Sequence, residues 1–278
     1  MQTYLDLLKH VISYGDIKSD PQGFGNIAIC GYQMRFRVSE SALPIVTTKK
    51  VSFRFIVGEL LWFLRGESNV KWLQDRKITI WDEWATVEAC TKYNLTPGDL
   101  GMIYGPLWRH WPTINGKEID QIDEVYRTLK INPDSRRLVV TSWHPEFTDK
   151  VFVAPCHCFF KFYHAQGRLS LHLFQRSADV FLGVPYNITS YSLLLLLMAK
   201  VTGLKPFEFI HTLSDSHLYN NSIEAAKLQI TRKPFMFPAV NLPEISDLST
   251  ETIKKIEPED FNLIGYNSHP AIKVAVGI

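Results

Sequence analysis

Apolar and polar residues alternate along the chain with periods that predict both helices and strands. Residues 4–14 place apolar side chains on one helical face, and Gly15 ends that segment. Residues 53–64 are dense in apolar side chains and predict a second helix, which Gly66 ends. A longer and strongly apolar helix is expected over residues 186–201. The pattern thus indicates helices that cover an apolar core.

Other segments predict strands, and the most regular of them form a hairpin. Two alternating apolar runs flank a short turn at Ala165–Gln166–Gly167, within residues 153–191. We also expect a strand at 27–38, where Gly31 marks a bulge or a bend. The remaining expectations are strands at 138–140 and 207–212, helices at 119–131 and 216–228, and an extended proline-rich segment at 233–242. Strands mixed with helices predict an α/β protein.

Composition restricts the class of protein further. The chain has 278 residues, 46% hydrophobic and 13% aromatic, which is enough for a sizeable core. It shows no repeat and no linker, so we expect one domain over residues 1–278. A net charge of +2 excludes a composition dominated by basic tails.

The cysteines and the apolar runs bear on the compartment. The cysteines are Cys30, Cys90, Cys156 and Cys158, without a CxxC pair or a metal-ligand spacing. We expect no signal peptide, and the longest apolar run, residues 193–199, is shorter than the roughly 20 residues of a membrane span. These features predict a cytoplasmic protein with free thiols, no membrane association and no metal.

The hairpin carries the first candidate for chemistry. Cys156 precedes its first strand and Arg176 lies near the end of its second, so pairing of the strands brings them close together. A guanidinium beside a thiol stabilises the thiolate, which is a nucleophile. The alternative is a buried structural cysteine beside a surface arginine.

Three further patterns each have a functional and a structural interpretation. Glu59 lies within an apolar helix, either as an exposed position or as a buried acid with a raised pKa suited to proton transfer. Trp81 and Trp84 are core packing or a stacking surface for a flat ligand. Arg136 and Arg137 are solvated surface charges or an anion site.

Taken together and in order, the residues resemble the thymidylate synthase family over nearly the whole chain. The segments that carry the resemblance are Thr47–Thr48–Lys49–Lys50, residues 59–64, residues 80–84, Asp99–Leu100–Gly101, Tyr104–Gly105, Asp134–Ser135–Arg136–Arg137, Pro155–Cys156–His157, Gln175–Arg176–Ser177, Asp179, Leu182–Gly183, Asn187–Ile188, Asp215, His217 and Tyr219. Each segment is weak evidence alone, whereas their joint order is very specific.

The resemblance implies a fold and a reaction. The fold is a large mixed sheet flanked by helices, with one sheet face forming a homodimer. The reaction is reductive methylation of dUMP to dTMP, with 5,10-methylenetetrahydrofolate giving both carbon and hydride. Cys156 attacks the pyrimidine C6, Arg176 lies beside it, Asn187 pairs with the base, Glu59 moves protons and Tyr104 assists removal of the C5 proton.

The resemblance also implies which residues hold the two ligands. The nucleotide is held by Gln175, Arg176, Ser177, Asn187, His217 and Tyr219, together with Arg136 and Arg137 of the partner subunit. The folate is held by Ile80, Trp81, Trp84, Asp179 and Gly183, with Lys49 near its glutamate tail and Ile278 closing over it; Asp179 is also placed in the catalytic set. No metal, membrane or DNA is implied.

Four positions depart from the family pattern. Pro21 stands where the family has an arginine that clamps the nucleotide phosphate. His144 replaces an asparagine, Ser222 replaces a histidine and Tyr186 replaces a phenylalanine. The catalytic set is intact, so affinity and substrate are affected more than chemistry. Two other functions therefore stay open: a pyrimidine nucleotide (dUMP, dCMP or CMP) C5-hydroxymethylase that uses the same folate, and a binding protein without turnover, against which the intact catalytic residues argue.

Overall fold

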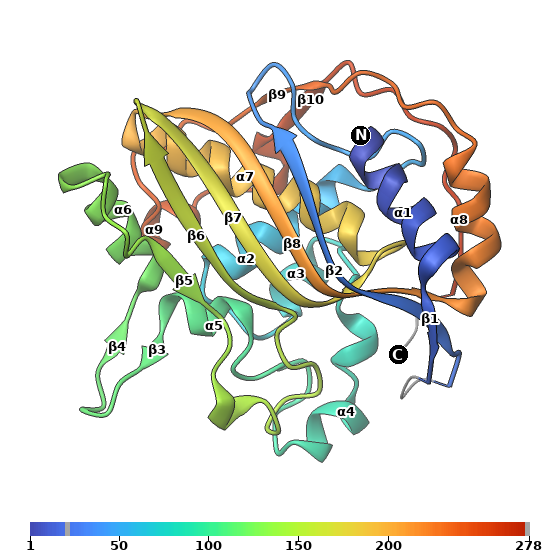
Figure 1. The fold of residues 1–278 in the computed structure, drawn as a ribbon. Coiled ribbons are helices and arrows are strands. Elements are labelled where there is room, and N and C mark those ends of the chain that lie inside the picture. The colour runs from blue at the N-terminus through green and yellow to red at the C-terminus, as the bar shows by residue number, and fades with distance from the viewer. Residues whose placement is uncertain (20–22, 276–278) are drawn as a thin grey trace.

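A computed structural model describes residues 1–19 and 23–275. In that part of the chain the largest sheet has the order β1-β2-β8-β7-β6-β5 (Figure 1). Its strands are β1 Asp16–Lys18, β2 Asn26–Arg37, β8 Lys205–Tyr219, β7 Arg168–Asp179, β6 His157–Ala165 and β5 Val139–Thr141. Only the pair β7 and β8 is parallel among these neighbours, so the sheet is mixed, as predicted.

The hairpin of β6 and β7 has the turn chemistry that the sequence predicts. Its two linking residues, Gln166 and Gly167, have φ of 53° and 71°. Positive φ at both central residues gives a turn whose twist matches that of the flanking strands. Arg176 near the end of β7 thereby comes back beside Cys156, just before β6.

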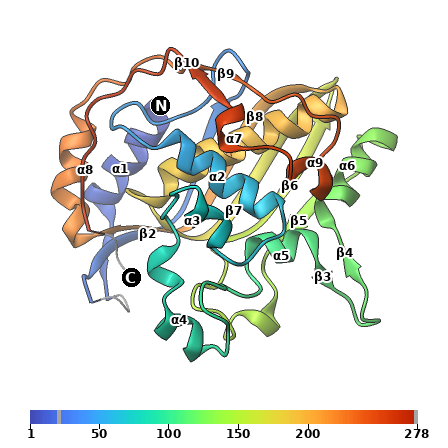
Figure 2. The same cartoon turned by 180° about the vertical axis from the view of Figure 1, so that it is seen from behind.

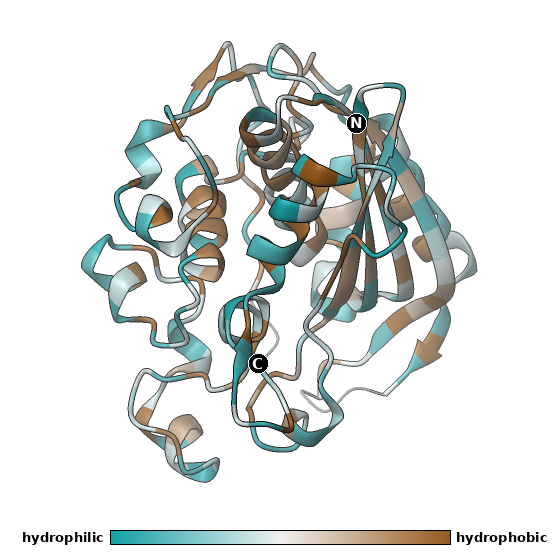
Figure 3. Ribbon diagram, turned by 90° about the vertical axis from the view of Figure 1, so that its left-hand side faces the viewer, coloured by the Kyte–Doolittle hydropathy of each residue, from teal (hydrophilic) through white to brown (hydrophobic). Residues whose placement is uncertain are grey.

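Helices cover one face of the sheet (Figures 2 and 3). The helix α7 (Gly183–Thr202) lies directly on the sheet, and α2 (Phe53–Leu64) packs on α7. The helix α1 (Gln2–Tyr14) packs against β2 and α8 (Ile223–Ile230). The shorter helices are α3 Lys71–Asp75, α4 Val87–Lys92, α5 Tyr104–Arg109, α6 Gln121–Ile131 and α9 Thr250–Ile253.

Two small sheets and four 3₁₀ turns complete the described elements. The small sheets pair β3 (Trp111–Pro112) with β4 (Glu118–Ile119) and β9 (Ala239–Asn241) with β10 (Asn262–Ile264). The turns are η1 Asp82–Trp84, η2 Pro145–Phe147, η3 Asn220–Ser222 and η4 Pro258–Asp260.

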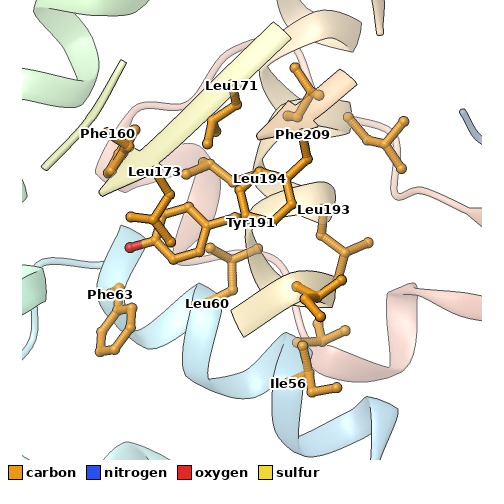
Figure 4. Packing of buried hydrophobic residues seen from close by; sticks show 14 of the residues in the cluster. Ile56, Leu60, Phe63, Phe160, Leu171, Leu173, Tyr191, Leu193, Leu194 and Phe209 are labelled. Carbon is orange, nitrogen blue, oxygen red and sulfur yellow. The ribbon is translucent and has the colours of Figure 1, made fainter. Parts of the chain in front are cut away.

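The core lies between α7, α2 and the inner face of the sheet (Figure 4). Tyr191 of α7 stacks on Phe209 of β8 at 6.1 Å between ring centroids, and Phe63 of α2 belongs to the same core. By length and composition α7 could cross a membrane, yet 89% of its most apolar window is buried inside the fold. A helix buried on all sides is apolar on all sides, which explains its composition.

The opposite face of the sheet carries exposed aromatic residues. On β6, the buried Phe160 and Phe162 alternate with Phe159 and Tyr163, which are 42% and 61% exposed. Phe159 stacks on Phe174 of β7 at 5.5 Å between centroids. Among the described residues no helix covers this face. It is the face that we expect to form the dimer, which stays a prediction.

Most predicted elements are confirmed, with two corrections. The helix expected at 216–228 begins only at Ile223, because β8 continues to Tyr219 between β2 and β7 and gains ladder hydrogen bonds on both sides. The same pairing makes the strand expected at 207–212 much longer. Of the bulge or bend expected at Gly31, the unchanged β2–β8 register on either side excludes the bulge, and the φ of 78° at Gly31 is compatible with the bend.

Candidate active site

Cys156 lies at the entrance to the central hairpin, half-buried. Its backbone carbonyl accepts a hydrogen bond from the Arg176 amide at 2.9 Å, so the predicted approach of these residues is confirmed. The guanidinium of Arg176 donates to the carbonyls of Pro155, at 3.0 Å, and Ala154, at 2.7 Å. Backbone groups thus hold the cation beside the thiol.

The charge of Arg176 does not by itself produce a resting thiolate. Burial raises the pKa of Cys156 above its ordinary value, and the nearby charge of Arg176 and a hydrogen bond with Tyr104 offset only part of that rise. The predicted effect of Arg176 on the thiolate is thus present, but burial outweighs it. Loss of hydration disfavours the anion more than Arg176 favours it, because the site is largely enclosed.

Tyr104, the first residue of α5, fixes the backbone of the cysteine. Its hydroxyl oxygen accepts a hydrogen bond from the Cys156 amide at 2.8 Å. The ring is buried against Phe63 and His157, at 4.7 and 4.9 Å between centroids. Burial raises the pKa of the phenol, so its proton stays in place near neutral pH.

Glu59 is a buried acid, which settles the alternative that the sequence left open. It is 8% exposed in the middle of α2, and its Oε1 accepts a hydrogen bond from Trp81 Nε1 at 2.9 Å. Burial raises its pKa to about 7, which the bond from Trp81 partly opposes. A carboxyl with this pKa can take up and release a proton near neutrality.

Asn187 and His157 form a buried pair. The sequence predicted a role for Asn187 but none for His157. Asn187, on α7, hydrogen-bonds the ring of His157, whose Nδ1 lies 3.1 Å from the hydroxyl of Tyr191. Burial lowers the pKa of His157 to about 4, so the ring is neutral. The sequence indicated His157 only as part of the cysteine motif. That His157 orients Asn187 is visible only in the folded structure, because the spacing of the two residues along the sequence does not indicate it.

Asp179 ends β7 and organises the turn into α7. Its Oδ1 accepts from the amides of Phe181, at 2.8 Å, and Leu182, at 3.0 Å. Burial raises its pKa. Gly183 follows, and a side-chain carbon there would lie 3.8 Å from Asn187 Oδ1. The turn thus joins a predicted folate residue to the predicted base-reading residue.

Lys49 lies in this same region but points inward. It is 4% exposed, its Nζ donates to the Phe181 carbonyl at 2.6 Å, and burial lowers its pKa to about 7. A lysine that binds a polyglutamate tail is expected at the surface. The role assigned to Lys49 stays a prediction, and its geometry favours a role inside the protein.

The expected nucleotide residues of β7 and β8 lie on paired strands. Ser177 pairs with Asp215, and Asp179 with His217, across the parallel β7–β8 ladder. His217 Nδ1 lies 3.0 Å from Asp215 Oδ1, and the ring of Tyr219 packs edge-on against His217 at 5.1 Å. These side chains therefore gather at the end of the strands where Cys156 lies.

Gln175 is buried rather than free to reach a ligand. Its Nε2 donates to the Ser177 carbonyl at 3.0 Å, and its Oε1 lies 2.8 Å from His211 Nε2. In this geometry it supports the strand that carries Arg176.

Arg136 and Arg137 are exposed and lie far from this chain's own cysteine. They precede Val139, which pairs with Lys161 on β6. Lys161 lies five positions after Cys156, about 16 Å along the chain at the usual rise of a strand. The structure does not bring these arginines to the site within one chain, which is the arrangement expected if they serve a partner subunit.

The tryptophans form an aromatic wall beside Glu59. The rings of Trp81 and Trp84 lie 5.5 Å apart at 60°. A small apolar hollow opens beside them, lined by Trp81, Trp84, Leu100, Ile103, Phe152 and Val153. Residues 82–84 form a 3₁₀ turn rather than an α-helix, and Ile80, half-buried, packs against the core just before it. The wall suits a flat ligand.

Some predictions fall outside the described residues, and one stays open. Pro21 and Ile278 lie outside them. Within residues 1–19 and 23–275 no group of three or more His, Cys, Asp or Glu side chains could hold a metal ion, and the absence of a metal stays an expectation.

Comparison with known families gives the identity. The model of the family described as Thymidylate synthase matches residues 2–278. Enzymes of this family transfer a one-carbon unit from methylenetetrahydrofolate to C5 of a pyrimidine nucleotide and are typically dimeric. A cysteine, a buried acid and an amide stand together here, as that chemistry requires. With a match along essentially its whole length, the chain belongs to the thymidylate synthase family.

Proposed function

We propose that this protein methylates dUMP reductively to dTMP, with 5,10-methylenetetrahydrofolate as the donor of carbon and hydride. The observation that carries the proposal is the aromatic wall of Trp81 and Trp84 next to the buried Glu59. We further propose that it is a single-domain, cytoplasmic homodimer in which Arg136 and Arg137 of each subunit bind the phosphate in the other.

The residues of the site divide the work on the nucleotide. Cys156 adds to C6 and makes C5 nucleophilic. Asn187 offers a donor to O4 and an acceptor to N3–H of uracil. Glu59 holds a proton at the O4 side, and Tyr104 lies against the Cys156 backbone, where it can assist removal of the C5 proton.

Residues on the other side of the site fit the folate. The half-buried indole rings of Trp81 and Trp84 offer flat apolar faces on which a ring system can stack. The amides of Phe181 and Leu182 both bond Asp179 through Oδ1, which leaves Oδ2 for a ligand N–H. When bound, the folate supplies the carbon and the hydride.

The choice between methyl and hydroxymethyl depends on water. Both products diverge from a pyrimidine with an exocyclic methylene, which takes hydride or water, whichever reaches it first. Enclosing a reactive intermediate excludes water. Trp81, bonded to Glu59 and packed on Phe63 and Tyr104, is an apolar shield of this kind. We therefore expect hydride transfer to dominate.

Product analysis tests the proposal. The protein is incubated with methylenetetrahydrofolate and dUMP, dCMP or CMP in turn, and the nucleotide products are identified by mass. We expect a methylated product from dUMP. A 5-hydroxymethyl nucleotide would make the enzyme a hydroxymethylase, and the absence of any product would favour a binding protein.

Asn187 is expected to determine the base. An Asn187→Asp change should weaken use of dUMP and favour dCMP, because a protonated carboxyl complements the N4 donor and N3 acceptor of cytosine. The measurement is kcat/KM for the two nucleotides. An unchanged ratio would mean that the base is recognised by other residues.

The proline at position 21 is expected to weaken nucleotide binding. A missing charge-assisted contact to phosphate costs about 1.5–3 kcal/mol. Arg109 cannot replace it, because its side chain is buried between Asp120 and the carbonyls of Leu64 and Leu248. Pro21→Arg should lower the KM for the nucleotide and leave nucleoside binding unchanged. Equal effects on both ligands would show that position 21 does not face the phosphate.

A further inference from the structure

The turn between β7 and α7, residues 179–182, is held by hydrogen bonds to its amides and carbonyls. The Val180 amide donates to the His217 carbonyl at 2.9 Å. The amides of Phe181 and Leu182 donate to Asp179 Oδ1. This turn, the 179–182 loop, therefore determines where the Asp179 carboxylate lies and how α7 begins.

Two side chains from distant parts of the sequence bind the carbonyls of this loop. Tyr4 of α1 donates its hydroxyl to the Val180 carbonyl at 3.0 Å. Lys49 donates a hydrogen bond from Nζ to the Phe181 carbonyl at 2.6 Å, and Nζ also lies 3.5 Å from the centroid of the Phe181 ring. Both side chains are buried, and Phe181 is fully buried.

The backbone around Lys49 is fixed as well. The preceding Thr48 is fully buried; its hydroxyl accepts from Gln229 at 2.9 Å, and its carbonyl accepts from Arg232 at 2.9 Å. The next residue, Lys50, is exposed. Of two adjacent lysines, then, one faces solvent and the other is held within the protein against a single loop.

We propose that Lys49 is a positioning residue, which holds the 179–182 loop so that Asp179 faces the folate site, rather than a contact for the glutamate tail of the folate. The inference rests on the proposed function for its meaning, because only folate use makes the position of Asp179 matter. The structural part of the inference does not depend on the proposed function, because Lys49 and Tyr4 hold the loop whatever ligand binds.

Amide hydrogen exchange tests the structural part without any substrate. Lys49→Met keeps an unbranched side chain and removes the hydrogen-bond donor. In this variant we expect the amides of the 179–182 loop to exchange at least about tenfold faster than in the unchanged protein. Lys50→Met removes the same charge one residue along and should leave them unchanged. Tyr4→Phe, which keeps the ring and removes the other side-chain donor, should also speed their exchange, and it serves if Lys49→Met does not fold.

Kinetics with folates of different length test the functional part. Lys49→Met should lower kcat/KM for the folate about ten- to a hundredfold, the range for loss of a charge-assisted hydrogen bond. The factor should be the same for monoglutamyl and polyglutamyl folates. The binding constant of the nucleotide alone should change little. Tyr4→Phe should show a smaller loss of the same kind.

Two results would overturn the inference: unchanged amide exchange in both variants, or a loss of kcat/KM that grows with the number of glutamates. Either would favour contact between Lys49 and the glutamate tail. If the unchanged protein turned over no folate, the proposed function would fail, while the exchange result would still decide how the loop is held.

Discussion

Replacing Cys156 by alanine is expected to lower turnover by a factor on the order of 10⁴ or more, the size of loss seen when an enzyme loses its nucleophile. The reason is that no other group described near the pyrimidine C6 can form the covalent adduct. Burial keeps Cys156 as a thiol at rest by raising its pKa, so its proton must leave as the nucleotide is attacked. The charge of Arg176, fixed by two carbonyls, then stabilises the sulfur as it ionises.

Two measurements check this. Steady-state assays give the loss of turnover, and intact-protein mass analysis after incubation with 5-fluoro-dUMP and folate detects the covalent complex. Cys158→Ala is the matched control: that thiol lies two residues along, is buried, and should be dispensable. A Cys156→Ala protein that still formed the complex would contradict the assignment of the nucleophile.

Replacing Glu59 by glutamine is expected to lower kcat by about 10²–10⁴-fold, the usual contribution of a positioned proton-transfer group. Glutamine keeps the shape and an oxygen to accept the Trp81 bond, so packing should survive. The pH dependence of kcat in the unchanged enzyme should contain an ionisation near the pKa of about 7 that burial gives Glu59. That ionisation should be missing from the residual activity of the variant.

The same substitution has an expected effect on stability, with a definite sign. The pKa of Glu59 is about 7 in the folded protein, against an ordinary 4.5. Between these values the folded state binds more protons than the unfolded state, so the free energy of unfolding falls as pH rises. From this group the fall amounts to about 3 kcal/mol. The glutamine of Glu59→Gln cannot ionise, so the variant should not show this fall in the free energy of unfolding. Denaturant unfolding at about pH 5 and about pH 8 would detect the difference. Equal pH dependence in both proteins would contradict the raised pKa.

The sequence predicted the parts of the site that depend on local pattern. The hairpin follows from the Gln166–Gly167 turn and two alternating runs, and it alone brings Cys156 to Arg176. The helix that carries Glu59 follows from its apolar density. Whether the acid was buried did not follow, because that depends on Trp81, 22 residues away.

Other features could not be predicted because they depend on contacts between distant segments. Lys49 meets Phe181 across 132 residues, and Tyr4 meets Val180 across 176. Periodicity does not predict such pairings, and the resemblance led to a surface role for Lys49. The extent of β8 was missed for the same reason, since its last residues are strand only because β2 and β7 lie on either side.

The most direct test of the proposed reaction follows both bonds at C5 in one sample. The enzyme is given dUMP tritiated at C5 together with methylenetetrahydrofolate, and tritium release and dihydrofolate absorbance are recorded over the same turnovers. We predict that the two appear in equal amounts, because each C5 proton lost is followed by one hydride transfer. Tritium release without dihydrofolate would contradict methylation and identify a hydroxymethylase, and no tritium release at all would contradict catalysis at C5.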